Sequence, residues 1–308
     1  MTAPLGVLVM AHGTPARTEE IAPFYTRIRR GRAPTDEQLA DLVRRYDAIG
    51  GLSPLTERTA AQVDALRAEL EARGPGRYLV AYGAKHAEPF IEDGAAALIG
   101  TGVSGVVGLV LTPHGSSMGS GEYLQRAAEA VGTEVPFVEV APWYAAPALV
   151  DLLAARITEA LDPLTPEQQA GCPVIFTAHS LPERIRQLGD SYPDQLAESA
   201  RLVATAAGLS DWSVAWQSAG RTPEPWLGPD VREVIVQLGA EGTDAVVVCP
   251  IGFVADHLEV LYDIDVEAAA VAAAAGVTLR RTASLNADPR FIAVLAQAVE
   301  DAVPTGLG

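Results

Sequence analysis

The sequence predicts an α/β protein made of two similar domains, each with a four-stranded parallel sheet flanked by helices. Short apolar runs, typical of strands buried on both faces, alternate with helical segments along the whole chain. Such alternation favours parallel strands joined by right-handed crossover helices. At 308 residues the chain is long enough for two domains of roughly 150 residues. We therefore expect domains at 1–145 and 146–308.

The expected elements follow the chain in the same order in both halves. In the first half, strands are predicted at 5–11, 78–82, 105–111 and 136–140, and helices at 18–30, 35–49, 57–73, 88–99 and 121–131. A helix at 147–161 leads into the second half. There, strands are predicted at 173–177, 212–216, 245–249 and 277–282, and helices at 193–207, 230–238, from about 256, and at 289–302.

Repeated motifs indicate that the two halves are related. LVMAHGTP at Leu8–Pro15 is similar to IFTAHSLP at Ile175–Pro182, and LVLTP at Leu109–Pro113 is similar to VVVCP at Val246–Pro250. Each pair lies at an equivalent strand of its domain. In open α/β sheets, ligands bind beyond the carboxyl ends of the strands. Because histidines and an acidic segment follow these strands, we expect an active site in a cleft between the domains.

The acidic segment 250–267, PIGFVADHLEVLYDIDVE, has two interpretations. On a regular helix beginning near Asp256, four carboxylates would share one face, those of Asp256, Glu259, Asp263 and Glu267. By itself this pattern is more typical of a solvated acidic surface. The alternative is a row of oxygen ligands that conducts a divalent metal ion. His257 is expected to lie off this row.

Composition excludes several classes of partner and cofactor. The net charge of −17 makes nucleic acid and anionic membranes poor partners. Cys172 and Cys249 are expected to be buried structural thiols, and two cysteines are too few for a four-cysteine iron–sulfur cluster. No signal peptide and no apolar stretch long enough to span a membrane are evident. These features predict a cytoplasmic globular protein.

Longer motifs resemble the ferrochelatase family, closest to its Gram-positive branch that inserts ferrous iron into coproporphyrin III. They are FTAHSLPERI, YPDQLAESA, WQSAGRTPEPWLGPDV and GFVADHLEVLYDIDVEA in the second half, and IRRGRAP, RRYDAIGGLSPL, KHAEPFIEDG and LTPHGSS in the first. The resemblance implies two Rossmann-like, chelatase-like domains and a lyase of haem biosynthesis. It also implies no cofactor beyond the substrate Fe²⁺, no stable membrane insertion, and a monomer that hands its product to the next enzyme of the pathway.

The resemblance also assigns residues by motif. His179 of AHSLP and Glu259 of DHLEVLYD match the family's catalytic and metal-holding residues, and Asp263 and Glu267 match its outer metal path. Porphyrin-contacting positions are matched by His12, Arg29, Arg45, Tyr46, Ser53 and Tyr123. At His12 this chain departs from the branch, which usually has a tyrosine that can ligate the product iron. His12 is therefore expected either to ligate that iron or to hydrogen-bond its own turn.

Chemistry supports these assignments independently. Metallation removes two pyrrole protons, and a neutral histidine, with an ordinary pKa of about 6.5, is a suitable base at pH 7. Arginines at 27, 29, 30, 32, 44 and 45 are either solvated helix ends or ligands for propionates. The four propionates of coproporphyrin suit them better than the two of protoporphyrin. Three alternatives stay open: a protoporphyrin ferrochelatase, a non-catalytic tetrapyrrole carrier of the same fold, and a cobalt or nickel chelatase.

Overall fold

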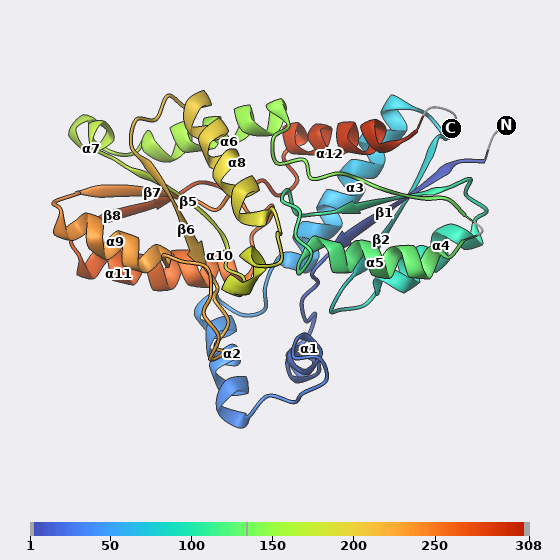
Figure 1. Cartoon of the computed structure of the whole chain (residues 1–308), viewed down its shortest axis with the longest axis horizontal. Coiled ribbons are helices and arrows are strands. Elements are labelled where there is room, and N and C mark those ends of the chain that lie inside the picture. Colours follow the sequence, from blue (N-terminus) through green and yellow to red (C-terminus); the bar gives the residue numbers. More distant parts are fainter. Residues whose placement is uncertain (1–2, 134, 305–308) are drawn as a thin grey trace. The chain divides into compact units, whose positions relative to one another are not determined.

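The computed structural model describes residues 3–133 and 135–304, which group into two compact units. The first unit consists of Met1–Trp143 and Asn286–Gly308, and the second of Tyr144–Leu285. Each contains a parallel four-stranded sheet, in the order β2-β1-β3-β4 in the first unit and β6-β5-β7-β8 in the second (Figure 1). The two sheets thus have the same topology, as the repeated motifs predict.

The first unit is a sheet covered by helices on both faces. Its strands are β1 (Leu5–Ala11), β2 (Tyr78–Ala84), β3 (Val106–Val110) and β4 (Phe137–Glu139). One face is covered by α4 (Ile91–Gly100) and α5 (Ser120–Val131), and the other by α3 (Leu55–Arg73) and α12 (Pro289–Ala302) (Figure 1). Every residue of β1 is buried, which confirms the apolar run there as a core strand.

The last helix belongs to the first unit, although the sequence placed it in a domain at 146–308. The apolar face of α12, formed by Phe291, Leu295 and Val299, is fully buried. Arg73 of α3 also binds Glu300 of α12 through an ion pair of 2.9 Å. Because these contacts join α12 to α3, the second unit ends at Leu285.

The second unit repeats the same layers. Its strands are β5 (Val174–His179), β6 (Trp212–Gln217), β7 (Ala245–Cys249) and β8 (Thr278–Arg281). One face carries α6 (Pro147–Leu161) and α8 (Tyr192–Ala206), and the other α9 (Val231–Ala240) and α11 (Ala269–Ala274) (Figure 1). Two short helices, α7 (Pro166–Ala170) and a 3-10 helix (Glu183–Arg186), complete it. Cys172 and Cys249 are buried free thiols, as expected.

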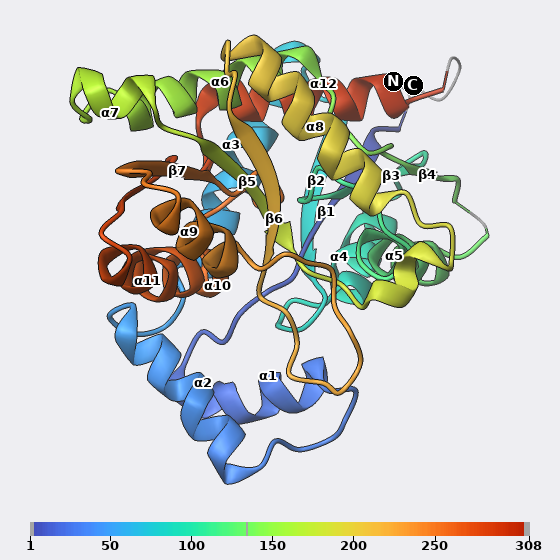
Figure 2. The ribbon, with the colours of Figure 1, turned by 60° about the vertical axis from the view of Figure 1, so that its left-hand side comes forward.

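Two helices of the first unit pack on each other outside its layers, α1 (Ile21–Ile28) and α2 (Asp36–Ala48) (Figure 2). The predicted capping box at the start of α2 is present, because the Thr35 side chain accepts from the Gln38 amide and the Gln38 side chain accepts from the Thr35 amide. Helix α1 follows a 3-10 turn at Thr18–Glu20 and is shorter than the predicted helix at 18–30. Arg30 has a φ of +54°, so the chain leaves the helix there.

The acidic segment does not form the regular helix that the sequence predicted. Helix α10 spans Leu258–Tyr262, and a π-helix over Asp263–Ala268 separates it from α11. A π-helix has a wider turn, so residues spaced by four no longer repeat along one face. Asp256 lies before α10, where its carboxylate accepts a 2.7 Å hydrogen bond from Ser284 and lies 3.6 Å from Arg281. The predicted row of four carboxylates is therefore wrong at Asp256.

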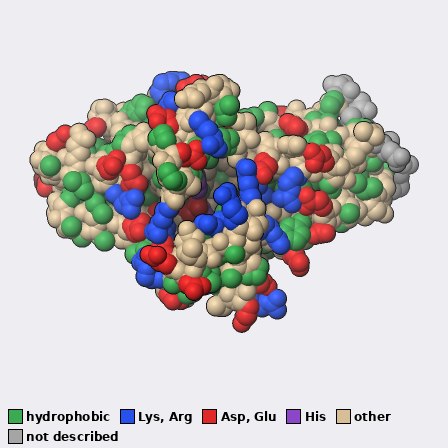
Figure 3. Space-filling model, turned by 60° about the horizontal axis from the view of Figure 1, so that its bottom comes forward, with side chains coloured by type: hydrophobic (Ala, Val, Ile, Leu, Met, Phe, Trp, Pro, Cys, Tyr) green, Lys and Arg blue, Asp and Glu red, His purple; other side chains and the backbone are tan. Residues whose placement is uncertain are grey.

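Among the described residues, no helix is long and apolar enough to cross a membrane. Figure 3 shows charged side chains of both signs interspersed on the face that it presents, with hydrophobic side chains scattered among them. The large hydrophobic side chains that are exposed lie on separate elements or loops: Ile28, Leu79, Leu188 and Val236.

Replacing His114, which follows β3, is expected to reduce the acid sensitivity of the fold. His114 is 2% exposed, and burial lowers its pKa to about 3. Below pH 6.5 the unfolded chain binds a proton that the folded chain does not bind until about pH 3, so the folded state loses stability as the pH falls. The loss reaches about 1.4 kcal/mol per pH unit well below pH 6.5 and amounts to about 1.6 kcal/mol between pH 6.5 and 5. Urea unfolding of His114→Gln should show a correspondingly weaker pH dependence, and equal slopes in variant and parent would contradict this.

Candidate active site

The site centres on His179 at the end of β5 and Glu259 in the first turn of α10. His179 Nε2 lies 3.5 Å from Glu259 Oε1. The other carboxylate oxygen, Oε2, lies 3.7 Å from Nε2 of His257. His257, expected to lie off the carboxylate row, precedes the helix in an extended conformation, with φ of −157° and ψ of 176°, and contacts Glu259 from there. Glu259 therefore lies between two imidazoles.

The backbone around His179 is fixed by buried polar side chains. The Tyr192 hydroxyl donates a 2.9 Å hydrogen bond to the His179 carbonyl, and Ser180 Oγ donates to the Leu227 carbonyl at 2.8 Å. His179 Nδ1 faces the Ser180 carbonyl, which can only accept, so Nδ1 carries a proton. This contact leaves Nε2 directed at Glu259.

The side chains of His179 and Glu259 carry opposite charges at pH 7. Burial disfavours the imidazolium, but the Glu259 carboxylate more than offsets it and raises the pKa of His179 to about 9. Burial likewise opposes ionisation of Glu259, but His179 and His257 hold its pKa well below the usual range. The side chains of His179 and Glu259 are 35% and 39% exposed, so solvent screens their attraction. His179 is therefore protonated, and not neutral as expected, while the ionised Glu259 carboxylate lies beside it.

A chain of hydrogen bonds that sequence reasoning missed connects the histidine strand to the glutamate helix. Thr177 Oγ1 donates to Gln217 Oε1 at 2.8 Å, and Gln217 Nε2 donates to the Glu259 carbonyl at 3.1 Å. The Gln217 carbonyl accepts from the Ser180 amide at 2.8 Å. Gln217 is also the β6 residue paired with His179 in the sheet. One buried glutamine therefore holds both residues of the pair.

The two outer carboxylates are each bonded to a neighbour. Asp263, which is 7% exposed, accepts a hydrogen bond from the Ser218 hydroxyl. Glu267 lies 3.3 Å from Arg232, which also binds Asp230 through two hydrogen bonds of 2.8 and 2.9 Å. In the described part of the chain, no group of three or more His, Cys, Asp or Glu side chains is arranged to hold a metal ion. An ion at His179 and Glu259 would thus need further ligands from water or substrate.

The first unit brings His12 and Tyr46, two of the expected porphyrin contacts, to the same turn. His12 follows β1, and its Nδ1 lies 3.0 Å from the Gly13 carbonyl. The His12 ring lies 4.7 Å from that of His86. The Tyr46 hydroxyl lies 3.4 Å from Thr14 Oγ1, so α2 contacts the turn directly after His12.

The other expected contacts of the first unit are spread over several elements. Arg29, at the end of α1, lies over the Tyr25 ring at 5.6 Å. Arg45 of α2 donates to Asp41 at 3.1 Å. Ser53 is buried before α3 and accepts from the Leu55 amide at 3.3 Å. Tyr123 of α5 lies 4.9 Å below the Lys85 ammonium group, and Lys85 was not among the residues expected from the sequence.

A family model for ferrochelatase matches residues 4–303 of this sequence. The chain belongs to the ferrochelatase family. It is 44% identical over 300 residues to the coproporphyrin III ferrochelatase of Bacillus subtilis, covering 96% of each chain. It is 43% identical over 298 residues to the ferrochelatase of Herpetosiphon aurantiacus, covering 96% of this chain and 98% of the relative. The coproporphyrin III ferrochelatase of Listeria innocua is 42% identical, with 98% and 99% covered.

Solved structures show that this ferrochelatase-family chain has the chelatase fold. The sirohydrochlorin chelatase SirB of Bacillus subtilis, in complex with cobalt, aligns over 97% of this chain and 95% of its own, with a TM-score of 0.59 and 12% identity. CbiX, described as the terminal enzyme of sirohaem biosynthesis in denitrifying bacteria, aligns over 97% and 100%, with a TM-score of 0.55 and 14% identity. These similarities confirm the predicted pair of Rossmann-like domains.

Proposed function

We propose that this protein inserts ferrous iron into coproporphyrin III to form coproheme, as a lyase of haem biosynthesis. The observation that carries the proposal is the 3.5 Å pair of His179 and Glu259. The family match and the coproporphyrin III ferrochelatases that are 42–44% identical over nearly the whole chain support the substrate and the metal. Fe²⁺ is a substrate in this proposal, and no resident cofactor is required.

In the proposed mechanism Glu259 binds the metal ion and His179 accepts a proton. Glu259 is ionised and holds the incoming Fe²⁺, with His257 beside the same carboxylate. Once the cation offsets the charge of Glu259, the interaction that keeps His179 protonated weakens, and the imidazolium releases its proton to solvent. Neutral His179 can then accept a pyrrole proton as a general base. A site with few protein ligands also suits a metal that must leave for the macrocycle.

We assign the supply of metal to the carboxylates that follow Glu259 along the chain. Asp263 and Glu267 lie on the π-helix directly after α10. Arg232 contacts Glu267 at 3.3 Å, so a cation that uses Glu267 must compete with this guanidinium. The expected role of these two residues as an outer metal path therefore includes a step in which Arg232 is displaced.

We assign porphyrin contacts to the six residues of the first unit that the motifs match: His12, Arg29, Arg45, Tyr46, Ser53 and Tyr123. Arg29 has no carboxylate partner among the residues that the structure describes, so its guanidinium is available for a propionate. A net charge of −17 is consistent with a protein that binds no nucleic acid. We further propose a cytoplasmic monomer that passes coproheme to the next enzyme of the pathway.

An anaerobic assay with Fe²⁺ and either coproporphyrin III or protoporphyrin IX tests this proposal, with insertion followed by absorbance. We expect coproporphyrin to be the better substrate by kcat/KM. A preference for protoporphyrin IX would show that it, and not coproporphyrin III, is the substrate. Tight binding of a porphyrin without insertion of iron would indicate a carrier. Supplying Co²⁺ and Ni²⁺ in parallel tests the remaining alternative.

His12 is expected to ligate the iron of the product. Imidazole is a common haem ligand, and His12 occupies the turn of the first unit that corresponds to the turn of His179 in the second. The ferric Soret and charge-transfer bands of bound coproheme should shift in His12→Ala, and binding should weaken. Coincident spectra of variant and parent would instead assign His12 to its contact with Gly13 alone.

A further inference from the structure

His86 lies in the loop directly after β2, where its main chain is bonded to that of His12. The His86 amide donates a 3.0 Å hydrogen bond to the His12 carbonyl, and the Lys85 amide donates to the Ala11 carbonyl at 2.9 Å. These two bonds continue the pairing of β2 with β1, which ends with Ala84 opposite Ala11. His86 is therefore fixed beside the turn that carries His12.

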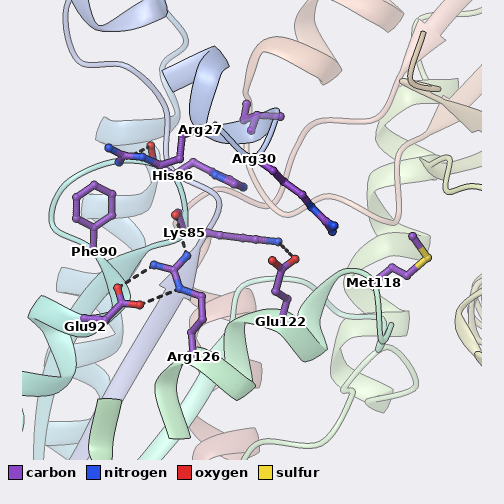
Figure 4. A pocket seen from close by; sticks show the side chains of 10 residues that line it. Arg27, Arg30, Lys85, His86, Phe90, Glu92, Met118, Glu122 and Arg126 are labelled. Atoms are coloured by element: carbon purple, nitrogen blue, oxygen red, sulfur yellow. Dashed lines mark hydrogen bonds and ion pairs between the residues drawn. The ribbon is translucent and has the colours of Figure 1, made fainter. Parts of the chain in front are cut away.

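The rings of the two histidines also pack against each other. Their centroids are 4.7 Å apart, and the ring planes are tilted by 52°. Phe24 of α1 meets both rings edge-on, at 5.9 Å from His12 and 6.4 Å from His86. Figure 4 shows His86 on the wall of a pocket of about 640 Å³, between the side chains of Arg27 and Lys85. His12 thus belongs to a cluster of three rings from β1, α1 and the loop after β2.

The hydrogen bond of His12 determines which of its nitrogens can bind a metal. Nδ1 lies 3.0 Å from the Gly13 carbonyl, which can only accept, so in the neutral ring Nδ1 carries the proton and Nε2 the lone pair. The turn itself is tight, because Gly13 has a φ of +81° and an added Cβ would lie 2.9 Å from the Cβ atoms of Ala84 and Ala87. The segment that contains His86 therefore shapes both the backbone and the ring of His12.

At its Nδ1 atom, the His86 ring contributes packing and no hydrogen bond. This atom is buried and has no hydrogen-bond partner among residues 3–133 and 135–304. Leaving a buried polar atom unpaired destabilises a fold, so nothing is lost there if carbon replaces the nitrogen. A hydrocarbon ring of similar shape should therefore make the same contact with His12.

We propose that His86 is a positioning residue, which holds the His12 ring so that Nε2 can bind the iron of coproheme. This role rests on the proposed ligation of the product by His12. Groups that contact a metal-binding histidine fix the orientation of its ring, and their loss weakens the bond to the metal. His86 acts through His12 in this way and does not bind the iron itself. Without the His86 ring, His12 can occupy other rotamers in which its lone pair points away from the iron.

The test uses the full chain and ready-made ferric coproheme, so it does not depend on insertion of iron. His86→Ala removes the ring, His86→Phe restores a ring without nitrogen, and His12→Ala removes the ligand. Tyr78→Ala is the matched control, because Tyr78 is another buried ring of the β2 segment with an unpartnered buried polar atom in the described structure. It pairs with Leu5, at the opposite end of the two strands from His12. Circular dichroism and urea unfolding report the fold and stability of each variant.

The ferric Soret and charge-transfer bands of His86→Ala should shift towards those of His12→Ala, and coproheme binding should weaken by a similar factor. His86→Phe should keep the bands of the parent, and Tyr78→Ala should keep them although its stability falls. In the double variant, coproheme should bind as it does in His12→Ala alone. A residue that acts through His12 has no further effect once His12 is absent.

The inference is overturned if His86→Ala keeps the parent spectrum, or if Tyr78→Ala shifts the bands as far as His86→Ala does. It is also overturned if His86→Phe loses the parent bands, because the nitrogens of His86 would then be required. Identical spectra of the parent and His12→Ala would exclude ligation by His12 and with it the role of His86. If His86→Ala changes the ligation but the parent inserts no iron, the proposed function fails and the role of His86 stands.

Discussion

Replacing Glu259 with Gln should abolish iron insertion while coproporphyrin remains bound. The amide has the size and shape of the carboxylate but no charge, so it can neither hold Fe²⁺ nor attract the imidazolium of His179 across 3.5 Å. Removing a group that takes part in proton transfer typically lowers a rate by about 10²- to 10⁴-fold. His179→Ala should have an effect of the same order, because it removes the proposed base. Anaerobic assays measure insertion, and fluorescence quenching measures porphyrin binding.

The matched control is Asp265→Asn on the neighbouring π-helix. Asp265 is an exposed carboxylate whose partner is Arg281, at 2.7 and 2.9 Å. This substitution removes the same charge within the same segment but leaves Glu259 and its two imidazoles in place. The mechanism would be refuted if Glu259→Gln inserted iron at a rate close to that of the parent, or if Asp265→Asn lost as much activity as Glu259→Gln.

A side chain at position 252 should destabilise the second unit and displace His179. A Cβ atom on Gly252 would lie 2.5 Å from Ala178 Cβ and 2.8 Å from Ala178 Cα, and Ala178 directly precedes His179. The Gly252 amide also donates to the Thr177 carbonyl at 3.1 Å, so the two segments cannot separate without losing this bond. Overpacking of this kind costs about 1–3 kcal/mol. Gly252→Ala should therefore lower both the free energy of unfolding in urea and the rate of insertion.

Gly171→Ala provides the comparison for this experiment. Gly171 ends α7 in the same unit, and the nearest atom to an added Cβ would be the Glu167 carbonyl oxygen at 4.0 Å. Its φ of −114° is open to any residue. We expect Gly171→Ala to unfold at the same urea concentration as the parent. If Gly252→Ala also unfolds at the same urea concentration as the parent, the close approach of Gly252 to β5 does not limit the stability of the protein.

Local rules predicted most of the fold because burial and capping act on short segments. The run Ala245–Cys249 is a fully buried strand, and the Thr35–Gln38 capping box starts α2 as expected. The partner of α12 could not be predicted in this way. The sequence of an amphipathic helix shows that one of its faces will be buried, but not which element will cover that face. Only the contacts with α3 assign α12 to the first unit.

The candidate site was predictable where long motifs resemble those of a known family, because a histidine at a strand end is by itself more often structural. The sequence indicated both His179 and Glu259, and the structure brings them together. It did not predict that the His257 ring faces Glu259, because a regular helix was assumed where the chain is extended. It also missed the pairing of Lys85 with Glu122 and of Arg126 with Glu92, since these partners are 37 and 34 residues apart and meet only in the folded unit.

The hydrogen bonds of Gln217 have a consequence for metal selectivity. Because Thr177, Gln217 and the main chain of Glu259 are linked by bonds of 2.8 and 3.1 Å, α10 cannot move away from β5 without breaking them. His179 and Glu259 should therefore chelate a cation with a fixed bite, which means that the separation of their ligand atoms does not adjust to the size of the cation. A fixed bite discriminates between divalent ions by radius and preferred bond angle, which charge alone cannot do. We expect Gln217→Ala to loosen that bite and to narrow the difference between Fe²⁺ and larger ions such as Mn²⁺ in their affinity for the pair.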